Sequence, residues 1–218
     1  EVYSALISPI DNKYFSNSSL NQHILNLNIM GATSYCPIIL AMFGKGYDEN
    51  DIEKAAKAIE VMIVRNFIVA NLTANKAEIS FSRIAFNISD DNPENDKRLD
   101  SIEKILDAIR AETINDEQFQ LSLITFEIKN ANTAKLLLRE ICRHINQETV
   151  VNPDNTVIHL EHIMPKNRGE WTHVTVEDHK KYLHRFGNLT LLLGTYNKAL
   201  KNKLFDIHRS VKFAAVVA

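Results

Sequence analysis

Apolar and polar positions in the first 150 residues alternate with the period of α-helices. Over residues 51–70, apolar side chains recur three or four positions apart, which is the spacing of one apolar helical face. These side chains are Ile52, Ala55, Ala56, Ile59, Ile63 and Phe67. The same kind of pattern predicts helices over residues 77–88, 97–110 and 131–145. We therefore predict that these amphipathic helices pack into a bundle.

The last two of these predicted helices each have an apolar face of their own. In residues 97–110 the face comprises Leu99, Ile102, Ile105, Leu106 and Ile109. In residues 131–145 it comprises Ala134, Leu137, Leu138, Ile141 and Ile145. Stripes of this kind are typical of a helical core, and none of them indicates a reaction centre.

The pattern changes after the fourth predicted helix. A polar segment that contains Pro153 interrupts the helical period. Beyond it, residues 156–160 and 188–193 are apolar runs of strand length. Thr175 opens a short helix with a pattern close to a capping box, and a last amphipathic helix is predicted over residues 195–211.

These elements predict the fold class and the division of the chain. We expect an α+β protein that is mainly helical. Residues 1–150 would form the helical bundle or connector region, and residues 151–218 a small ββα domain.

Composition is typical of a folded, soluble protein. The chain is 45% hydrophobic with only 6 glycines and 5 prolines, which argues against disorder. It has no apolar run of the roughly 18 to 20 residues that span a bilayer and no secretory signal pattern. We therefore expect a cytoplasmic protein without a membrane partner. Cys36 and Cys142 match no metal or disulfide pattern and are predicted to be buried thiols.

Charge is distributed unevenly along the chain. Residues 1–158 carry 15 Lys and Arg against 22 Asp and Glu, whereas residues 159–218 carry 10 against 5, together with six of the eight histidines. A basic, histidine-rich segment on an acidic remainder favours contact with a polyanion.

The clearest candidate chemistry lies in that basic segment. Glu161 and His162 are adjacent at the end of an apolar run, and Asn188 and Asn197 follow nine positions apart. Hydrolysis of a phosphodiester needs an activated water and a cation that offsets the charge on the phosphate. A histidine can take the proton from water, while carboxylate and amide oxygens suit Mg²⁺ or Mn²⁺. The pattern therefore indicates a nuclease with one metal ion per site.

Adjacent positions on a strand impose a condition on this site. Neighbouring strand side chains point to opposite faces, so a site that uses both Glu161 and His162 requires the chain to turn there. Pro165, shortly afterwards, fits a strand that has just ended.

The same residues carry a resemblance to a known family. HIMP at residues 162–165 and FGNLTLL at residues 186–192, with Trp171, Asn197, Asn202 and Phe205, resemble the C-terminal nuclease domain of GmrSD-type restriction proteins. More broadly, the order of elements is similar to the ββα-metal, or His-Me finger, nucleases of the HNH class. The resemblance covers residues 157–212 most closely.

That resemblance implies an activity and partners. It implies a divalent-metal-dependent endonuclease that cuts double-stranded DNA, in bacterial restriction of foreign or modified DNA. It also implies an NTP-using domain upstream in the full-length protein, which agrees with a chain that begins at Glu1 without a methionine.

The resemblance also implies a role for each site residue. His162 resembles the general base that activates water, and Glu161 and Asn197 resemble the metal ligands. Asn188 resembles the asparagine that holds the catalytic loop and so orients the histidine. His159 lies at a position where some relatives carry an acidic residue, and it is a further candidate metal ligand. Three side chains are candidate phosphate contacts because they are basic and close to Asn197: Lys198, Lys201 and Lys203.

Two other functions stay open at this point. The histidines could hold a structural zinc ion, although structural zinc sites usually contain cysteines and this segment has none. The segment could also be an inactive nuclease-like module that binds DNA or a protein partner. A zinc protease is excluded because His159 and His162 are three positions apart, whereas the HExxH motif places them four apart.

Overall fold

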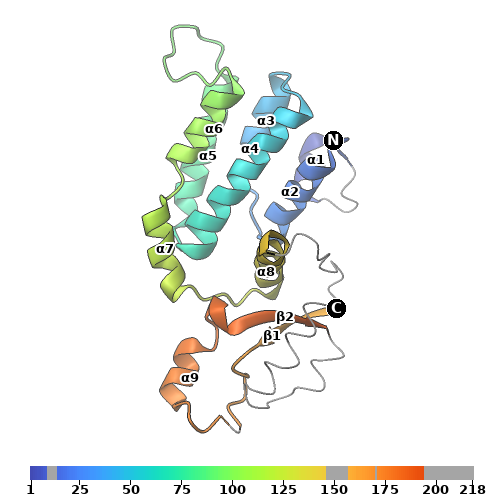
Figure 1. Ribbon diagram of the computed structural model, residues 1–218. Helices are drawn as coiled ribbons and strands as arrows, with labels where there is room; N and C mark the ends of the chain where they lie inside the picture. Colours follow the sequence, from blue (N-terminus) through green and yellow to red (C-terminus); the bar gives the residue numbers. More distant parts are fainter. Residues whose placement is uncertain (9–13, 146–156, 170, 194–218) are drawn as a thin grey trace. The chain divides into compact units, whose positions relative to one another are not determined.

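The structure is a computed structural model that describes residues 1–8, 14–145, 157–169 and 171–193 (Figure 1). Contacts divide the chain into two compact units, Glu1–Ile124 and Thr125–Ala218, here called unit 1 and unit 2. The first unit is helical, and the second contains the two strands. The predicted mainly helical α+β fold class is confirmed.

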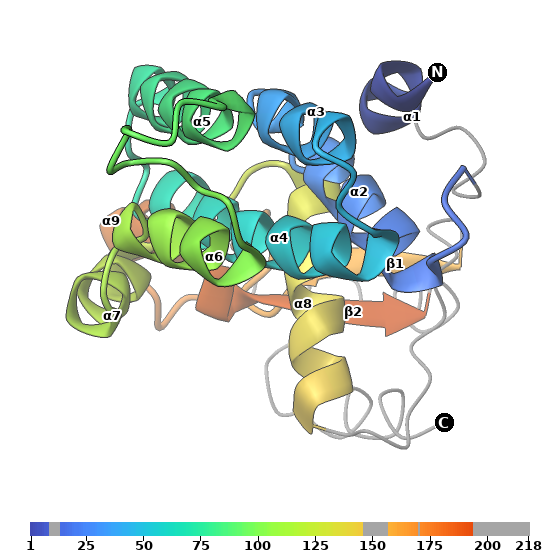
Figure 2. The ribbon, with the colours of Figure 1, turned by 90° about the horizontal axis from the view of Figure 1, so that it is seen from above.

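Unit 1 consists of helices joined by short connections. Its elements are α1 (Val2–Ile7), α2 (Ser18–Ile29), α3 (Cys36–Gly44), α4 (Glu49–Met62), η1 (Ile63–Val69), α5 (Ala74–Ser89), α6 (Ile102–Ala111) and α7 (Asp116–Thr125), which ends at the boundary between the units. The helices form two layers: α5, α3 and α1 lie in one row, and α6, α4 and α2 lie in the other (Figure 2).

The core of unit 1 lies between these layers. Helix α4 buries the side chains of Ile52, Ala55, Ala56, Ile59 and Met62, which confirms the face predicted for the first part of residues 51–70. Helix α5 contributes Phe81, which is 0% exposed. Burial of such side chains is the main favourable term in the folding of a bundle.

The end of the predicted helix 51–70 differs from an ordinary α-helix. Residues Ile63–Val69 form the π-helix η1. Within η1, the Asn66 side chain donates a hydrogen bond to the Glu112 carbonyl oxygen (2.7 Å) and accepts one from the Ile114 amide (2.9 Å). These bonds tie the turn after α6 to the wider helical turn. π-helical turns are rare in proteins and are frequently found at functional sites.

Helix α6 begins later than predicted. It starts at Ile102 rather than residue 97, because the Ser101 hydroxyl accepts a hydrogen bond from the Lys104 amide and caps the helix. The preceding residues form turns in which Asn92 and Asn95 side chains accept hydrogen bonds from backbone amides. Local side-chain bonds therefore replace the first helical turn that the apolar spacing suggested.

A histidine between two carboxylates joins α2 to α4. His23 lies 2.6 Å from Glu60 through Nδ1 and 3.2 Å from Glu53 through Nε2. Burial lowers the pKa of His23, but the hydrogen bonds and negative charges of Glu60 and Glu53 outweigh it and raise the pKa above 6.5. His23 is therefore a structural link within unit 1.

Unit 2 is built around a two-stranded antiparallel sheet. Its elements are α8 (Ala131–Ile145), β1 (Ile158–His162), α9 (Val176–Tyr182), the 3₁₀ turn η2 (Phe186–Asn188) and β2 (Leu189–Leu193). Helix α8 contacts both strands. The pairs Ile158–Leu193 and His162–Leu189 mark the two ends of the strand register.

The short helix α9 confirms the predicted cap. The Thr175 hydroxyl accepts a hydrogen bond from the Asp178 amide at 3.0 Å, and it also donates one to the Asp178 carboxylate at 2.8 Å. The pattern at Thr175 therefore fixes the start of α9. The predicted helix over residues 195–211 lies outside the described residues.

Helix α8 has the predicted length, but part of its predicted inward face is wrong. Ala134 is buried, whereas Ile141 is exposed and Ile145 is 77% exposed. The buried residues of α8 include Leu136 and Arg139. Within the described residues, α8 packs against a two-stranded sheet, which covers a shorter stripe than the neighbours of a helix inside a bundle would.

The predicted start of the nuclease domain at about residue 150 stays a prediction. The two compact units meet between Ile124 and Thr125, so α8 belongs to the same unit as the strands.

In the part of the chain that the structure describes, no helix is long and apolar enough to cross a membrane. Cys36 is a buried free thiol as predicted, and Cys142 is free but only half-buried.

Candidate functional site

Strand β1 carries three of the predicted site residues. Its two ends, Ile158 and His162, are buried, and His162 is 9% exposed. His159 is exposed and Glu161 is half-buried. Because strand side chains alternate, His159 and Glu161 share one face of β1 and His162 lies on the other.

The chain turns directly after His162. His162 is the last residue of β1 and pairs with Leu189, the first residue of β2. The Ile163 amide donates a hydrogen bond to the Asn188 carbonyl oxygen at 2.8 Å. The chain therefore turns only after His162, and Glu161 and His162 both lie within β1 with their side chains on opposite faces. A site that uses both side chains stays a prediction.

Asn188 holds this turn with its side chain as well as its backbone. Its Oδ1 accepts a hydrogen bond from the Met164 amide at 2.7 Å, and its Nδ2 donates to the carbonyl oxygens of Met164 (3.1 Å) and Leu183 (2.9 Å). One amide side chain thus ties the segment after His162 to the segment before β2. This is the geometry that the loop-holding role of Asn188 requires, and its part in catalysis stays a prediction.

A second histidine lies against His162. The ring centroids of His162 and His184 are 5.8 Å apart, with an interplanar angle of 80°. The His184 carbonyl oxygen accepts a hydrogen bond from the Ile128 amide at 3.0 Å. His184 follows no ligand spacing along the chain, and it meets His162 only because β1 pairs with β2. Its place beside His162 could therefore not be predicted from the sequence.

The loop between β1 and α9 is packed by its own side chains. Trp171 is 6% exposed, and its ring stacks on His173 at a centroid distance of 5.4 Å. Arg168 donates a hydrogen bond to the Val174 carbonyl oxygen at 2.6 Å, and His179 Nε2 lies 2.8 Å from the Pro165 carbonyl oxygen. Trp171 therefore packs within the loop.

The donor set on β1 fits a divalent cation in part. The Glu161 carboxylate is a hard oxygen donor suited to Mg²⁺ or Mn²⁺, and His159 on the same face is an imidazole donor. Across the described residues, no group of three His, Cys, Asp or Glu side chains is placed to hold a metal ion. Asn197, the other predicted ligand, lies outside the described residues.

The predicted phosphate contacts also lie outside the described residues. These are Lys198, Lys201 and Lys203. The structure thus brings His162 together with Asn188 and places His159 with Glu161, while the four predicted site residues beyond β2 stay predictions.

Replacing Asn188 with aspartate is expected to lower the free energy of unfolding of unit 2 by about 1–3 kcal/mol, because it leaves partly buried polar groups without their hydrogen-bond partner. The aspartate would still accept from the Met164 amide, but a carboxylate oxygen would face the carbonyl oxygens of Met164 and Leu183. Urea unfolding followed by the fluorescence of Trp171, the single tryptophan of the chain, measures this change within unit 2.

The matched control is Asn167→Asp in the same loop. Asn167 is exposed, and its Oδ1 accepts a hydrogen bond from the Gly169 amide at 3.2 Å. An aspartate can do the same, so the control should stay within about 0.5 kcal/mol of the parent chain. Equal unfolding free energies for both variants would contradict the assigned role of the Asn188 amide.

Comparison with known proteins identifies part of the chain. Residues 113–215 match the family model described as GmrSD restriction endonucleases, C-terminal domain. The match confirms the resemblance predicted from the sequence motifs, and it extends upstream to include α7 and α8. No curated protein matches the chain.

Proposed function

Because residues 113–215 match the C-terminal domain of the GmrSD restriction endonucleases, we propose that this chain is a DNA endonuclease that hydrolyses phosphodiester bonds by a one-metal, HNH-type mechanism. The observation that carries the proposal is the end of β1. There a buried histidine is followed at once by a turn that Asn188 holds with three side-chain hydrogen bonds.

In this proposal His162 is the general base. Its imidazole takes the proton from the attacking water, which makes the water nucleophilic near neutral pH. Asn188 acts through the backbone: by fixing Met164 it limits the orientations that the end of β1 can adopt. Such preorganisation keeps a proton acceptor within reach of the reacting water.

The proposed cation is Mg²⁺ or Mn²⁺, one per site. Glu161 and Asn197 would hold it, with His159 as a further candidate ligand. A bound divalent ion would offset the negative charge that develops on the phosphate as its bond to the leaving oxygen breaks. The single carboxylate among these side chains leaves room for substrate oxygens, which is typical of magnesium sites.

Double-stranded DNA is the proposed substrate. The excess of basic residues over residues 159–218 favours a polyanion, and Lys198, Lys201 and Lys203 are the proposed phosphate contacts. By family resemblance, the setting is restriction of foreign or modified DNA in the bacterial cytoplasm. An NTP-using domain of the same full-length protein is the proposed upstream partner.

The test is cleavage of supercoiled plasmid by the purified chain. We expect nicked or linear product with Mg²⁺ or Mn²⁺ and no product with a chelator. DNA binding that is indifferent to divalent cations, with no cleavage under either condition, would support the alternative of an inactive nuclease-like module.

A further inference from the structure

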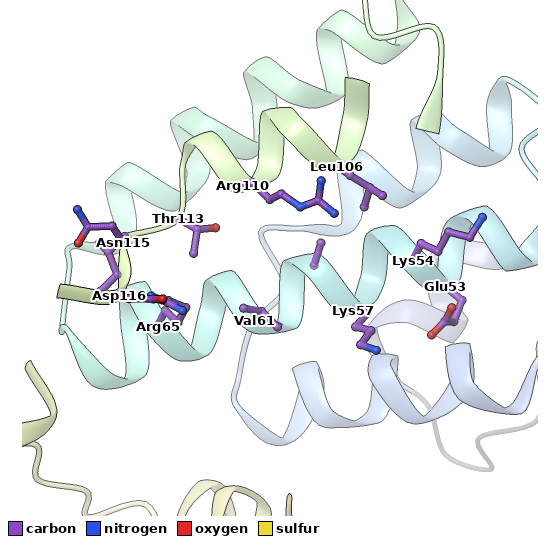
Figure 3. Close-up of a pocket in the computed structure, with 12 residues that line it drawn as sticks. Glu53, Lys54, Lys57, Val61, Arg65, Leu106, Arg110, Thr113, Asn115 and Asp116 are labelled. Carbon is purple, nitrogen blue, oxygen red and sulfur yellow. The ribbon is translucent and has the colours of Figure 1, made fainter. Parts of the chain in front are cut away.

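A surface groove in unit 1 lies between α4 with η1 on one side and α6 with the following turn on the other (Figure 3). Its volume is about 670 Å³. Most of its lining residues precede residue 113, so the family match does not account for them.

The middle of the groove is apolar. The side chains that form it are Ala58, Val61, Leu106 and Ile114. Val61 is 46% exposed, although it lies on a helix whose other apolar residues are mostly buried. Water therefore covers an apolar strip between two helices, and covering that strip with a partner's apolar side chains would be favourable.

Four cations surround this strip. Figure 3 shows Arg110 across the groove from Lys57, with Lys54 and Arg65 towards its two ends. Lys54 lies on α4 and Arg65 on η1, so the two cations flank the strip along its length. Two carboxylates, Glu53 and Asp116, also line the groove, so its lining has an excess of positive charge.

The wall of the groove around Arg65 is held in place. Its guanidinium lies 2.6 Å from the Asp116 carboxylate and 4.7 Å from the centroid of the Phe119 ring. Asn66 bonds the backbone at Glu112 and Ile114, as described above. A groove with fixed walls loses little conformational entropy on binding, which favours recognition.

We propose that this groove binds an amphipathic helix of a partner protein, with apolar side chains on the strip and Asp or Glu residues along both flanks. Helices present apolar anchors three and four positions apart, and grooves between two helices accept them. The carboxylates of the partner would face Lys57 and Arg110 on opposite edges. This charge complementarity selects an acidic helix over a basic one.

The apolar strip favours this partner over nucleic acid. Three of the cations lie close to carboxylates of this chain: Lys54 to Asp51 at 2.7 Å, Arg65 to Asp116 at 2.6 Å and Arg110 to Asp107 at 2.9 Å. A DNA backbone carries a phosphate charge about every 1.7 Å of axis, and four cations that are mostly paired within the chain do not match that charge density. An amphipathic helix needs only a few ion pairs, and its apolar side chains cover the strip that DNA would leave exposed to water.

The probe is a fluorescent synthetic helical peptide with leucines three and four positions apart and glutamates on both flanks. Its twin carries lysines in place of the glutamates. Fluorescence anisotropy with the full chain should show saturable binding of the acidic peptide at about 100 μM or below, and at least about tenfold weaker binding of the basic twin. Val61→Asp should weaken binding of the acidic peptide by about tenfold or more.

The double variant Lys57→Glu/Arg110→Glu tests the charge argument directly. It should weaken binding of the acidic peptide and strengthen binding of the basic twin, and a merely structural defect would not do both. Matched controls elsewhere in unit 1 are Phe86→Asp, at a position 66% exposed on α5, and Lys76→Glu on the same helix. Both should bind the acidic peptide like the parent chain, and all variants should melt at similar temperatures.

Several outcomes would overturn the proposal. They are equal binding of the two peptides, binding indifferent to Val61→Asp, and no saturable binding of the acidic peptide. Displacement of the peptide by a DNA duplex that itself loses affinity for the double variant would assign the groove to nucleic acid. Self-association of the parent chain that Val61→Asp abolishes would assign it to a second copy. None of these results depends on whether the chain cleaves DNA.

Discussion

Replacing His162 with alanine is expected to lower the rate of plasmid cleavage by a factor of about 10² to 10⁴, the range typical of a lost general base. Without the imidazole, the attacking water would have to give its proton to solvent. His162 is 9% exposed at the end of β1, so no bulk base can replace it efficiently. The measurement is the initial rate of loss of supercoiled plasmid at saturating Mn²⁺ or Mg²⁺.

The control separates chemistry from folding. His144→Ala removes another imidazole of unit 2, at an exposed position near the end of α8, and should leave the cleavage rate unchanged. Both variants should show the Trp171 fluorescence of the folded parent chain and bind DNA in the presence of a chelator. Cleavage by His162→Ala at the parent rate would remove His162 from the mechanism, whatever the metal requirement.

Replacing Phe81 with alanine is expected to reduce the free energy of unfolding of unit 1 by about 3–5 kcal/mol, which is the usual cost of removing a buried phenylalanine ring. Phe81 is 0% exposed and belongs to the core between the two helical layers. Truncation loses the transfer energy of the ring and leaves a cavity. Chemical denaturation followed by far-ultraviolet circular dichroism measures the loss of helix.

Helix α5 provides a matched control for this substitution. Phe86 belongs to the same helix but is 66% exposed. Phe86→Ala makes the same chemical change at the surface and should alter the free energy of unfolding by no more than about 0.5 kcal/mol. Similar losses for both variants would show that the layer arrangement of unit 1 is wrong.

Sequence periodicity correctly predicted the helices in which buried positions recur with the helical period. The positions Ile52, Ala55 and Ile59 follow the helical period and are buried as expected, because one face of α4 meets the core along its whole length. Sequence periodicity could not predict the π-helical turn at Asn66. It depends on hydrogen bonds to Glu112 and Ile114, which are distant in sequence.

Helix α8 shows a second limit of periodicity. Its apolar pattern predicted its bounds, but Ile141 and Ile145 are exposed. Periodicity indicates which residues share a face but not how much of that face a partner covers. Among the described residues, α8 packs against a sheet of two strands, a fact that the helix sequence does not contain.

The candidate site was predictable where its residues are local. The adjacent Glu161 and His162, and the end of the strand beside them, follow from a short motif. The bonds of Asn188 to Met164 and Leu183, and the contact of His184 with His162, required the pairing of β1 with β2. These contacts join segments that only the antiparallel register brings together.

The register of β1 with β2 limits how the length of this segment can vary. Deleting one residue within β1 would exchange its two faces, turning Glu161 towards the side that now buries His162 and moving the imidazole to the opposite side. The described residues between Pro165 and Thr175 include no strand residue, so insertions there would leave the alternation intact. Length changes that preserve the site should therefore be confined to this connecting loop.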